Sequence, residues 1–544
     1  MEIKRIDPLG IISGIIKELG LIQSIDERLK KDQNDQENIS PGEAIAGMII
    51  NGLGFSDKPL SLTPKFFETK ALEILFRSDV KAEHFNRHKL GKVLDMTHDY
   101  GCEQLFYELS LKSCIQEKIN TQFNSEDTTT FSLTGQYSED TDEATIKITQ
   151  GYSKDHRQDL KQVVQELMVS QDGGVPLMMK SWDGNASDNE IFRERSQALI
   201  NHFKESIEPR YLIADSKLYT EKNATNLDQI PFITRVPGTI KDEGCAINEA
   251  ISKEQWQVLD PANKFYIKNI IHYNIVQRWL VVYSEKARER SKKTLEKSCK
   301  KEHILIEKEI WHLSNQAYDC EGDAEKALKK LLKKCRFHTL DTQEINQKKV
   351  YEYKGRPKAE TVPSTVRYFI LGTIKQDKET LDKMLNEKSC YVLATNIATD
   401  ELNEVEIIQA YKRQNSSIEN MGFRFLKDPI FFTSSLFLKK PSRIMGLLMV
   451  MTLALLVYSI AQRRLRNKLE ENKETLPNQI NQPTRTPTLR WIFQLMEGVH
   501  IVKIKVDGVS KIIINGIDSI KKKIIMLLGE AVISIYQIQI NEFT

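Results

Sequence analysis

The sequence predicts an α/β protein in which a mixed sheet is preceded by a small helical domain and interrupted by a β-rich insertion. Three observations support this. Apolar residues recur at helical spacing through the first 118 residues, and from residue 120 short strand-like runs replace them. A helical run then leads into further strands, as in α/β proteins. About 165 residues of mixed basic and apolar pattern (236–400) precede the next strong helix.

The charges of the chain nearly balance. Its 544 residues hold 78 Lys and Arg against 75 Asp and Glu, which gives a formal charge of +3. No overall basic field therefore indicates a polyanionic partner, and any nucleic-acid surface must be local. Basic residues do cluster, although such runs are more often solvated helix faces. The clusters are 286–301, 329–336, 463–468 and 521–523.

Cysteine usage and hydropathy bear on the compartment. The seven cysteines show no C-x-x-C spacing, which fits a reducing cytosol and argues against a structural zinc site. Residues 1–20 mix charges with apolar residues, so we expect no signal peptide. The uncharged run 444–460 has 17 residues, fewer than the roughly 20 that a spanning helix needs. We expect a buried helix there and no membrane partner.

The region before the sheet reads as helical, with apolar residues at helical spacing in 8–29, 44–53 and 89–111. It holds no catalytic grouping. A helical domain of this kind could bind DNA, pair with another subunit or cover the core, and the sequence leaves these alternatives open.

The first strand of the sheet carries one aspartate among threonines, Asp127 in the run 125–131. Threonine and phenylalanine favour strands, whereas aspartate is depleted from strands and costs several kcal/mol when buried as an unpaired ion. A metal ion or a polar partner would remove this conflict. The alternative is that Asp127 ends the strand or opens a turn.

The next segments predict further strands and a helix. Residues 144–150 alternate as a one-sided strand should, and 163–170 and 175–180 form a hairpin around Asp172-Gly173. Ser187 and Glu190 form a capping box before a helix over 191–203.

That helix leads into the apolar run 211–214, which ends in Asp215. Polar side chains at the carboxyl ends of strands face the crevice where α/β sheets bind ligands. If this strand rejoins the sheet beside the first, Asp127 and Asp215 become neighbours, and two carboxylates repel unless one is protonated or a cation lies between them. Oxygen ligands without His or Cys suit Mg²⁺ or Mn²⁺. The alternative is that Asp215 caps the next turn.

Downstream of Asp215, residues 232–235 form another probable strand, and the insertion 236–400 comes next. Its lysines could neutralise phosphates or simply keep the surface soluble. These lysines are Lys292, Lys293, Lys329, Lys330, Lys333 and Lys334. A helical pattern over 405–425 then carries Glu419, which offers a third carboxylate or faces solvent. The tail predicts a hairpin of 499–506 and 509–514 around Asp507-Gly508.

Six segments in this order resemble the bacterial insertion-sequence DDE transposases, in the branch with a β-rich insertion between the second aspartate and the glutamate and a Tyr-Arg-Glu-Lys signature. The segments are Asp127 to Phe131 (DTTTF), Gly151 to Arg157 (GYSKDHR), Tyr211 to Ser216 (YLIADS), Phe232 to Pro237 (FITRVP), Gly422 to Pro429 (GFRFLKDP) and Thr488 to Phe493 (TLRWIF). They span most of the chain from about residue 125 to 495.

The resemblance implies an RNase H-like core in which Asp127, Asp215 and Glu419 hold two Mg²⁺ or Mn²⁺ ions. It implies cleavage at the ends of a transposon and transfer of the freed 3′-hydroxyl into target DNA. The partners would be double-stranded DNA, as terminal inverted repeats and as target, and a second copy of the chain in a synaptic homodimer in the bacterial cytosol. The domains expected are 1–118 (helical, DNA-binding or dimerising), 119–235 (core, first part), 236–400 (insertion), 401–466 (core, second part) and 467–544 (linker and tail).

One departure concerns the signature around Glu419. The family has seven positions from Tyr to Glu and from Glu to Lys, whereas here Tyr411, Glu419 and Lys427 are each eight apart and Arg413 comes one position early. On one α-helix an added residue rotates all later side chains by about 100°. This departure weakens Tyr411, Arg413 and Lys427 as DNA-binding residues more than it weakens Glu419, whose competitor is Asp428.

His156 and Arg157 are auxiliary candidates for DNA contact, although a polar turn would hold them equally well. Two other functions stay open. Another RNase H-like nuclease would cut DNA without strand transfer, and a catalytically inactive or domesticated relative would only bind DNA.

Overall fold

The computed structural model describes residues 2–30, 37–54, 59–135, 137, 145–154, 157–187, 190–191, 193–195, 210–351, 362–428, 438–506 and 509–537, with the backbone alone at 342–343, 415, 419–420, 505–506 and 509–511. The chain divides into two compact units. Unit 1 comprises 1–234, 273–275 and 396–544, and unit 2 comprises 235–272 and 276–395.

Unit 1 begins with a helical region. Its main helices are α1 (Leu9–Glu18), α2 (Leu21–Leu29), α3 (Pro41–Leu53), α6 (Arg87–Tyr100) and α7 (Cys102–Gln116), with short α4 (Thr63–Phe67) and α5 (Leu72–Leu75) between them. Ser40 starts α3 with a capping box, because its hydroxyl accepts from the backbone of Glu43 while the Glu43 carboxylate accepts from the backbone of Ser40. The helical expectation for this region is confirmed.

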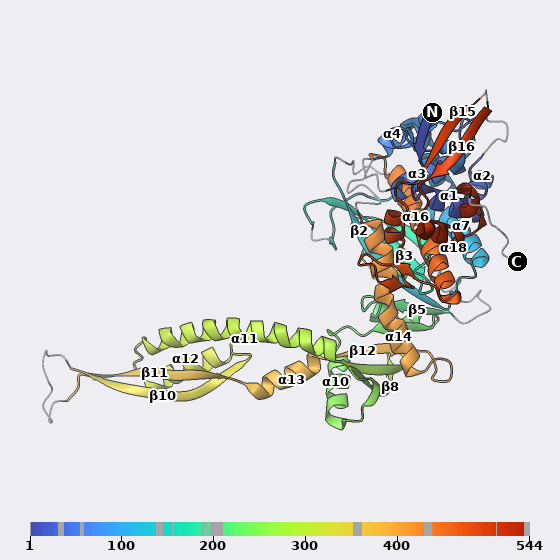
Figure 1. Cartoon of the computed structure of the whole chain (residues 1–544). Coiled ribbons are helices and arrows are strands. Elements are labelled where there is room, and N and C mark those ends of the chain that lie inside the picture. Colours follow the sequence, from blue (N-terminus) through green and yellow to red (C-terminus); the bar gives the residue numbers. More distant parts are fainter. Residues whose placement is uncertain are drawn as a thin grey trace. The chain divides into compact units, whose positions relative to one another are not determined.

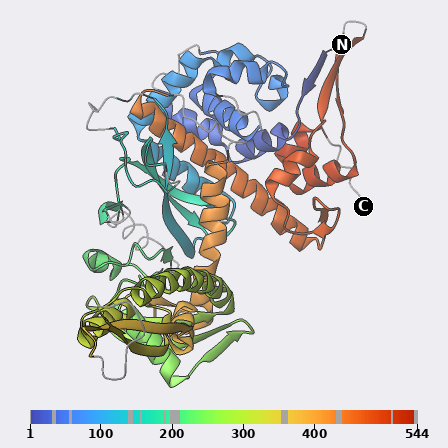
Figure 2. The ribbon, with the colours of Figure 1, turned by 90° about the vertical axis from the view of Figure 1, so that its left-hand side faces the viewer.

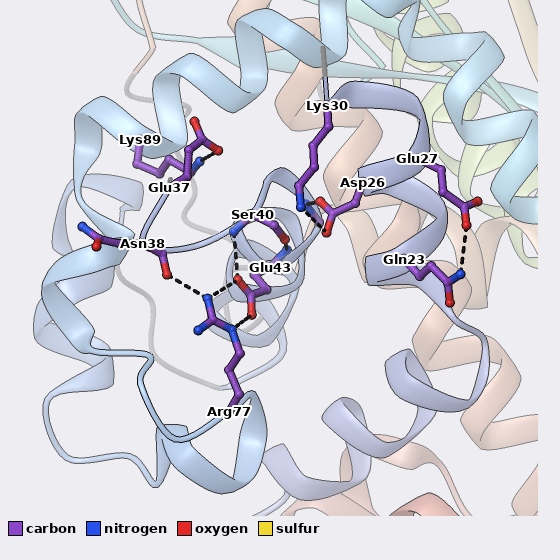
Figure 3. A network of polar contacts seen from close by, with 11 residues as sticks. Gln23, Asp26, Glu27, Lys30, Glu37, Asn38, Ser40, Glu43, Arg77 and Lys89 are labelled. Atoms are coloured by element: carbon purple, nitrogen blue, oxygen red, sulfur yellow. Dashed lines mark hydrogen bonds and ion pairs between the residues drawn. The ribbon is translucent and has the colours of Figure 1, made fainter. Parts of the chain in front are cut away.

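A polar network fixes the chain in front of α3 (Figure 3). Arg77 donates to the carboxylate of Glu43 at 2.7 Å and to the backbone oxygen of Asn38 at 2.9 Å. The hydrogen bond to Glu43 raises the pKa of Arg77. Lys89 pairs with Glu37 in the same network. Since these partners come from separate segments, we assign the network a structural role.

The sheet of unit 1 has the order β4-β3-β2-β5-β6. Its strands are β2 (Phe123–Leu133), β3 (Lys161–Ser170), β4 (Pro176–Trp182), β5 (Tyr211–Ala214) and β6 (Phe232–Arg235). β3 pairs antiparallel with β2 and β4, while β5 pairs parallel with β2 and β6, so the sheet is mixed. Gly173 and Gly174, with φ of 81° and 65°, make the β3–β4 turn.

One expected strand of this sheet is absent. The prediction of a strand over 144–150 is wrong in the described residues 145–150, where Thr149 makes only an isolated bridge to Gln162. The capping box of Ser187 and Glu190 is present, and the described part of the following helix reaches residue 195. The rest of the predicted helix over 191–203 lies outside the described residues.

Helix α16 (Pro441–Glu471) runs through unit 1 between the N-terminal helices and the C-terminal elements (Figure 2). It is long and apolar enough to cross a membrane, yet 89% of its most apolar stretch is buried inside the protein. It packs against α1, α3, α6, α7 and β4. The apolar side chains of α16 therefore belong to the core of this unit.

The two ends of the chain meet in unit 1. Strand β1 (Glu2–Arg5) pairs with β15 (His500–Val506), which forms the predicted hairpin with β16 (Val509–Asn515). Helix α1 packs on α19 (Glu530–Ile535), and the Tyr536 hydroxyl donates to the backbone oxygen of Asp7. The other C-terminal elements are β13 (Leu476–Pro477), β14 (Pro483–Thr484), α17 (Leu489–Leu495) and α18 (Ser519–Leu527).

Unit 2 combines strands with long helices. Its strands are β7 (Gln257–Asp260), β8 (Asn263–His272), β9 (Ile275–Ser284) and β12 (Cys390–Thr395), in the order β12-β9-β8-β7, and the hairpin β10 (His338–Val350) and β11 (Thr365–Gln376). Its helices are α10 (Lys241–Lys253), α11 (Glu285–Ser314), α12 (Glu321–Leu332) and α13 (Lys378–Lys388). Figure 1 shows α11 lying along the β10–β11 hairpin. The unit is thus mixed α and β rather than only β-rich.

Candidate active site

Asp127 and Asp215 occupy matching positions on neighbouring parallel strands. The β2–β5 register pairs Ser125 with Ile213, so two residues further along Asp127 is level with Asp215, which directly follows β5. Residues two apart on a strand share a face, so Asp127 lies on the same face of β2 as Ser125. Both aspartates line one cavity of about 30 Å³, where a water-sized particle fits.

Lys154 contacts Asp127 from the loop before β3. Its Nζ lies 3.2 Å from Asp127 Oδ1 and donates to the Thr128 hydroxyl at 2.7 Å. The backbone N–H of Lys154 donates to the Thr130 hydroxyl at 3.2 Å, so the loop is held against β2. The Lys154 ammonium is therefore a cation in contact with Asp127. Sequence reasoning placed Lys154 in the GYSKDHR segment without assigning it to the site.

Asp215 has a turn function as well as its place in the cavity. Its Oδ1 accepts from the backbone N–H of Lys217 at 2.8 Å, and its backbone oxygen accepts from the Thr234 hydroxyl of β6 at 2.8 Å. The two interpretations of Asp215 given by the sequence are therefore compatible, because one carboxylate oxygen shapes the turn while the side chain lines the cavity.

A buried cluster of charges adjoins the cavity. Glu126 also lines it, and burial together with the neighbouring Glu166 raises the pKa of Glu126 well above its usual range. Glu166 accepts from Trp182 Nε1 at 2.8 Å and from Arg195 Nε at 3.1 Å. Among the described residues, Glu126 Oε2 is buried without a hydrogen-bond partner. Sequence reasoning missed this cluster, for which glutamates inside two apolar strand runs were the available signal.

Glu419 lies on a π-helix, η4 (Asn415–Phe423), which packs on β2 and β3. Ser417 donates to the hydroxyl of Ser125 at 3.4 Å, and a Cβ at Gly422 would lie 3.0 Å from Leu167, the cross-strand partner of Asp127. The backbone of Glu419 thus lies between two contacts to the face that carries Asp127. The Glu419 side chain lies outside the described part of the structure.

The π-helix changes the interpretation of the spacing around Glu419. The expected rotation of about 100° per added residue assumes an α-helix throughout. The chain is α-helical in α14 (Glu404–Gln414), π-helical in η4 and α-helical again in α15 (Arg424–Leu426), so that assumption is wrong for 415–423. A π-helix bonds i to i+5 and takes one residue more per ring than an α-helix, so it accommodates added residues.

The remaining site candidates are spread over several environments. Arg413 is exposed, and Tyr411 and Lys427 are partly buried. Arg157 is exposed and pairs with Asp159 at 2.8 Å, and His156 lies outside the described residues. Their role in DNA binding stays a prediction. The competitor Asp428 accepts from Arg490 at 2.8 Å, so its carboxylate is engaged in an ion pair.

The donor set of the cavity suits a hard cation. Its lining residues offer carboxylate and hydroxyl oxygens and no His or Cys side chain, which is the ligand preference of Mg²⁺ and Mn²⁺, although the lining also includes the cation of Lys217. Within the described ranges, no three His, Cys, Asp or Glu side chains gather closely enough to hold a metal ion. The fit therefore rests on the two aspartates, with Glu419 as the predicted third ligand.

Comparison with known proteins adds three findings. Residues 1–111 match a family described only as a domain of unknown function, DUF4277. No curated protein matches the chain. Among solved structures, a cryo-EM structure of the piggyBac transposase synaptic complex with hairpin DNA is similar at 9% identity and a TM-score of 0.37, over 90% of this chain and 80% of that one.

Proposed function

We propose that this chain is a DNA transposase that cleaves transposon ends and transfers the 3′-hydroxyl into target DNA with divalent metal ions. The observation that carries the proposal is the placement of Asp127, on β2, level with Asp215, which directly follows β5, around one cavity. Two carboxylates so placed repel unless a cation or a proton lies between them. The six-segment resemblance supports DNA as the substrate.

The candidate residues have distinct roles in this proposal. Asp127 and Asp215, with Glu419 as third ligand, would hold two Mg²⁺ or Mn²⁺ ions. When bound, such ions polarise a phosphoryl oxygen and activate the attacking oxygen. Lys154 holds the loop before β3 against β2 and balances the charge of Asp127. Arg157, with Tyr411, Arg413 and Lys427, would contact DNA phosphates.

The proposal includes the binding partners and the cellular compartment. The DNA partners would be the terminal inverted repeats and the target duplex, bound by a homodimer in the synaptic complex in the bacterial cytosol. The flanking DNA of the gene bears on this directly, because inverted repeats on either side would mark a mobile element.

A non-catalytic DNA-binding relative is the second candidate. The specific observation in its favour is the contact between the Lys154 ammonium and Asp127 at 3.2 Å. An internal cation compensates a carboxylate that a metal would otherwise neutralise. The two candidates differ in whether the full chain binds Mn²⁺ at this site.

The deciding experiment incubates the full chain with Mn²⁺ and a labelled terminal repeat and measures Mn²⁺ binding in parallel. Strand-transfer product supports the transposase, cleavage alone supports another nuclease, and a shifted but uncut complex supports the non-catalytic relative. Asp127→Asn and Asp215→Asn should each lower cleavage on the order of 10³-fold, because metal ligands supply several kcal/mol of transition-state stabilisation.

The matched control is Asp99→Asn, since Asp99 is exposed in the same unit and does not line the cavity. It should cleave as the unchanged chain does. Unaltered cleavage and Mn²⁺ binding in both site variants would contradict the catalytic assignment.

A further inference from the structure

Helix α11 packs in unit 2 through one side only. Its buried residues Leu295, Cys299, Ile306 and Ile310 recur at helical spacing and face the β10–β11 hairpin, α12 and α13. Cys299 packs with Phe337 and Leu385, and Ile306 and Ile310 pack with Leu331. The opposite side of this 30-residue helix is exposed over its whole length.

That exposed side carries a stripe of seven cations. Successive residues of an α-helix are about 100° apart, so these side chains fall within roughly 100° of the circumference. From the first to the last they span about 33 Å at 1.5 Å per residue. The α11 stripe consists of Lys286, Arg290, Lys293, Lys297, Lys300, Lys301 and Lys308, all of them exposed. Ile304 and Trp311, 66% and 62% exposed, lie on the same line.

The acidic residues of α11 lie elsewhere on the helix. Glu302 turns toward the packed side and accepts from the backbone of Phe337 at 2.8 Å, and Glu309 pairs with Lys334 at 2.9 Å. Glu289, Glu296 and Glu307 flank one edge of the stripe, by the same helical geometry. The stripe itself therefore contains no carboxylate.

The charges of the α11 stripe are not neutralised inside the protein. In the part of the chain that the structure describes, none of its seven residues forms an ion pair. The lysines of the neighbouring α12 differ, since Lys326 pairs with Asp323 and Lys329 with Glu325. Two lysines of α12 are thus paired with carboxylates of their own helix, whereas the seven cations of the α11 stripe face solvent.

We infer that the α11 stripe is a binding surface for the sugar-phosphate backbone of duplex DNA. Duplex DNA carries one negative charge per about 1.7 Å of its axis, and the length of the stripe is close to one helical turn of about 34 Å. A straight row of cations can meet phosphates where the two backbones cross its line, and it does so without reading the sequence, because phosphate contacts position a protein and carry no base information. The inference rests on the proposed function only in the choice of DNA among polyanions.

The test measures the affinity of the full chain for a duplex of unrelated sequence, roughly 30 base pairs or three turns long, by fluorescence anisotropy over a range of NaCl concentrations. The stripe variant combines Lys293→Gln, Lys297→Gln and Lys300→Gln. Its plot of log affinity against log salt should be shallower by about 2.7, and at about 0.1 M salt it should bind on the order of 10²-fold more weakly.

The matched control combines Lys326→Gln, Lys329→Gln and Lys334→Gln, which removes the same charge from lysines that have carboxylate partners. Its slope should stay near that of the unchanged chain. Equal slopes for the stripe variant and the unchanged chain would overturn the inference. Tighter binding of an RNA hairpin than of the duplex, lost in the stripe variant, would overturn the choice of DNA.

The outcome is separable from that of the proposed function. Asp127→Asn should lose cleavage and keep the salt slope of the unchanged chain. A chain that cleaves terminal repeats but shows no effect of the stripe variant refutes the stripe alone. A chain whose stripe binds duplex DNA without Mn²⁺-dependent cleavage refutes the transposase alone.

Discussion

Two basic helix segments look alike in the sequence and differ in the structure. On α16, Arg463 donates to Asp172 at 2.7 Å and Arg464 to Glu117 at 2.5 Å, while Arg466 donates to the backbone oxygen of Pro487 at 2.9 Å. The α11 stripe has no ion pair within the described part of the chain. The first segment ties unit 1 together, and the second offers its charge to solvent.

The difference teaches that a run of basic residues is informative only once its partners are known. Charge counts alone treat both segments alike, and the formal charge of +3 conceals both. An arginine that reaches carboxylates on distant segments contributes to stability, because its loss leaves partly buried carboxylates without their cation. A lysine without a partner contributes little to folding and is available for an external anion.

The largest effect is expected at Arg464. This side chain, 15% exposed, contacts Glu18 and Glu117, and donates to the backbone oxygen of Leu528 at 2.7 Å. Arg464→Met should lower the free energy of unfolding by about 3–5 kcal/mol, because it leaves two carboxylates without their cation in a largely buried site. Urea unfolding of the full chain measures this change.

The control for Arg464→Met is Arg290→Met on the α11 stripe, an exposed arginine that also lies on a long α-helix. Its unfolding midpoint should stay close to that of the unchanged chain. Comparable losses in the two variants would break the distinction between the two segments.

The sequence predicted much of this fold because its local patterns agree with the observed strands and with the pairing of β2 and β5. The strands β2, β3, β4 and β5 follow from β-favouring or apolar runs and a turn at Asp172-Gly173, and the parallel β2–β5 pairing brings Asp127 level with Asp215 as the strand order suggested. The π-helix η4 was not predictable from periodicity, since apolar spacing assumes 3.6 residues per turn. Lys154, Glu126 and Glu166 were missed because their roles depend on contacts between strands.

The second prediction, of intermediate size, concerns how the buried carboxylate of Glu126 makes the free energy of unfolding depend on pH. Burial and Glu166 hold the pKa of Glu126 well above its usual range, so folded Glu126 keeps its proton at pH values where the unfolded chain has lost it. The unfolded chain then binds fewer protons, and stability falls as pH rises above the ordinary glutamate pKa of about 4.3.

Glu126→Gln should remove this contribution, because a glutamine cannot ionise at the buried position. The free energy of unfolding should then fall less between about pH 4.3 and neutrality, and the variant should be more stable than the unchanged chain at neutral pH. Thermal unfolding over a pH series measures the slope. Glu83→Gln, at a side chain 75% exposed, should leave the slope as it is, and an unchanged slope in Glu126→Gln would contradict the assignment.

The smallest effect is expected for the stability of the α11 stripe itself. Lys293→Gln, Lys297→Gln and Lys300→Gln together should change the free energy of unfolding by no more than about 0.5 kcal/mol, since exposed side chains without partners contribute little. Relief of repulsion between lysines four residues apart is offset by the loss of attraction from Glu289 and Glu296, each four residues before a substituted lysine. Urea unfolding without DNA measures this change, and a loss above roughly 2 kcal/mol, the tail expected only of buried or capping residues, would show that the stripe supports the fold rather than a partner.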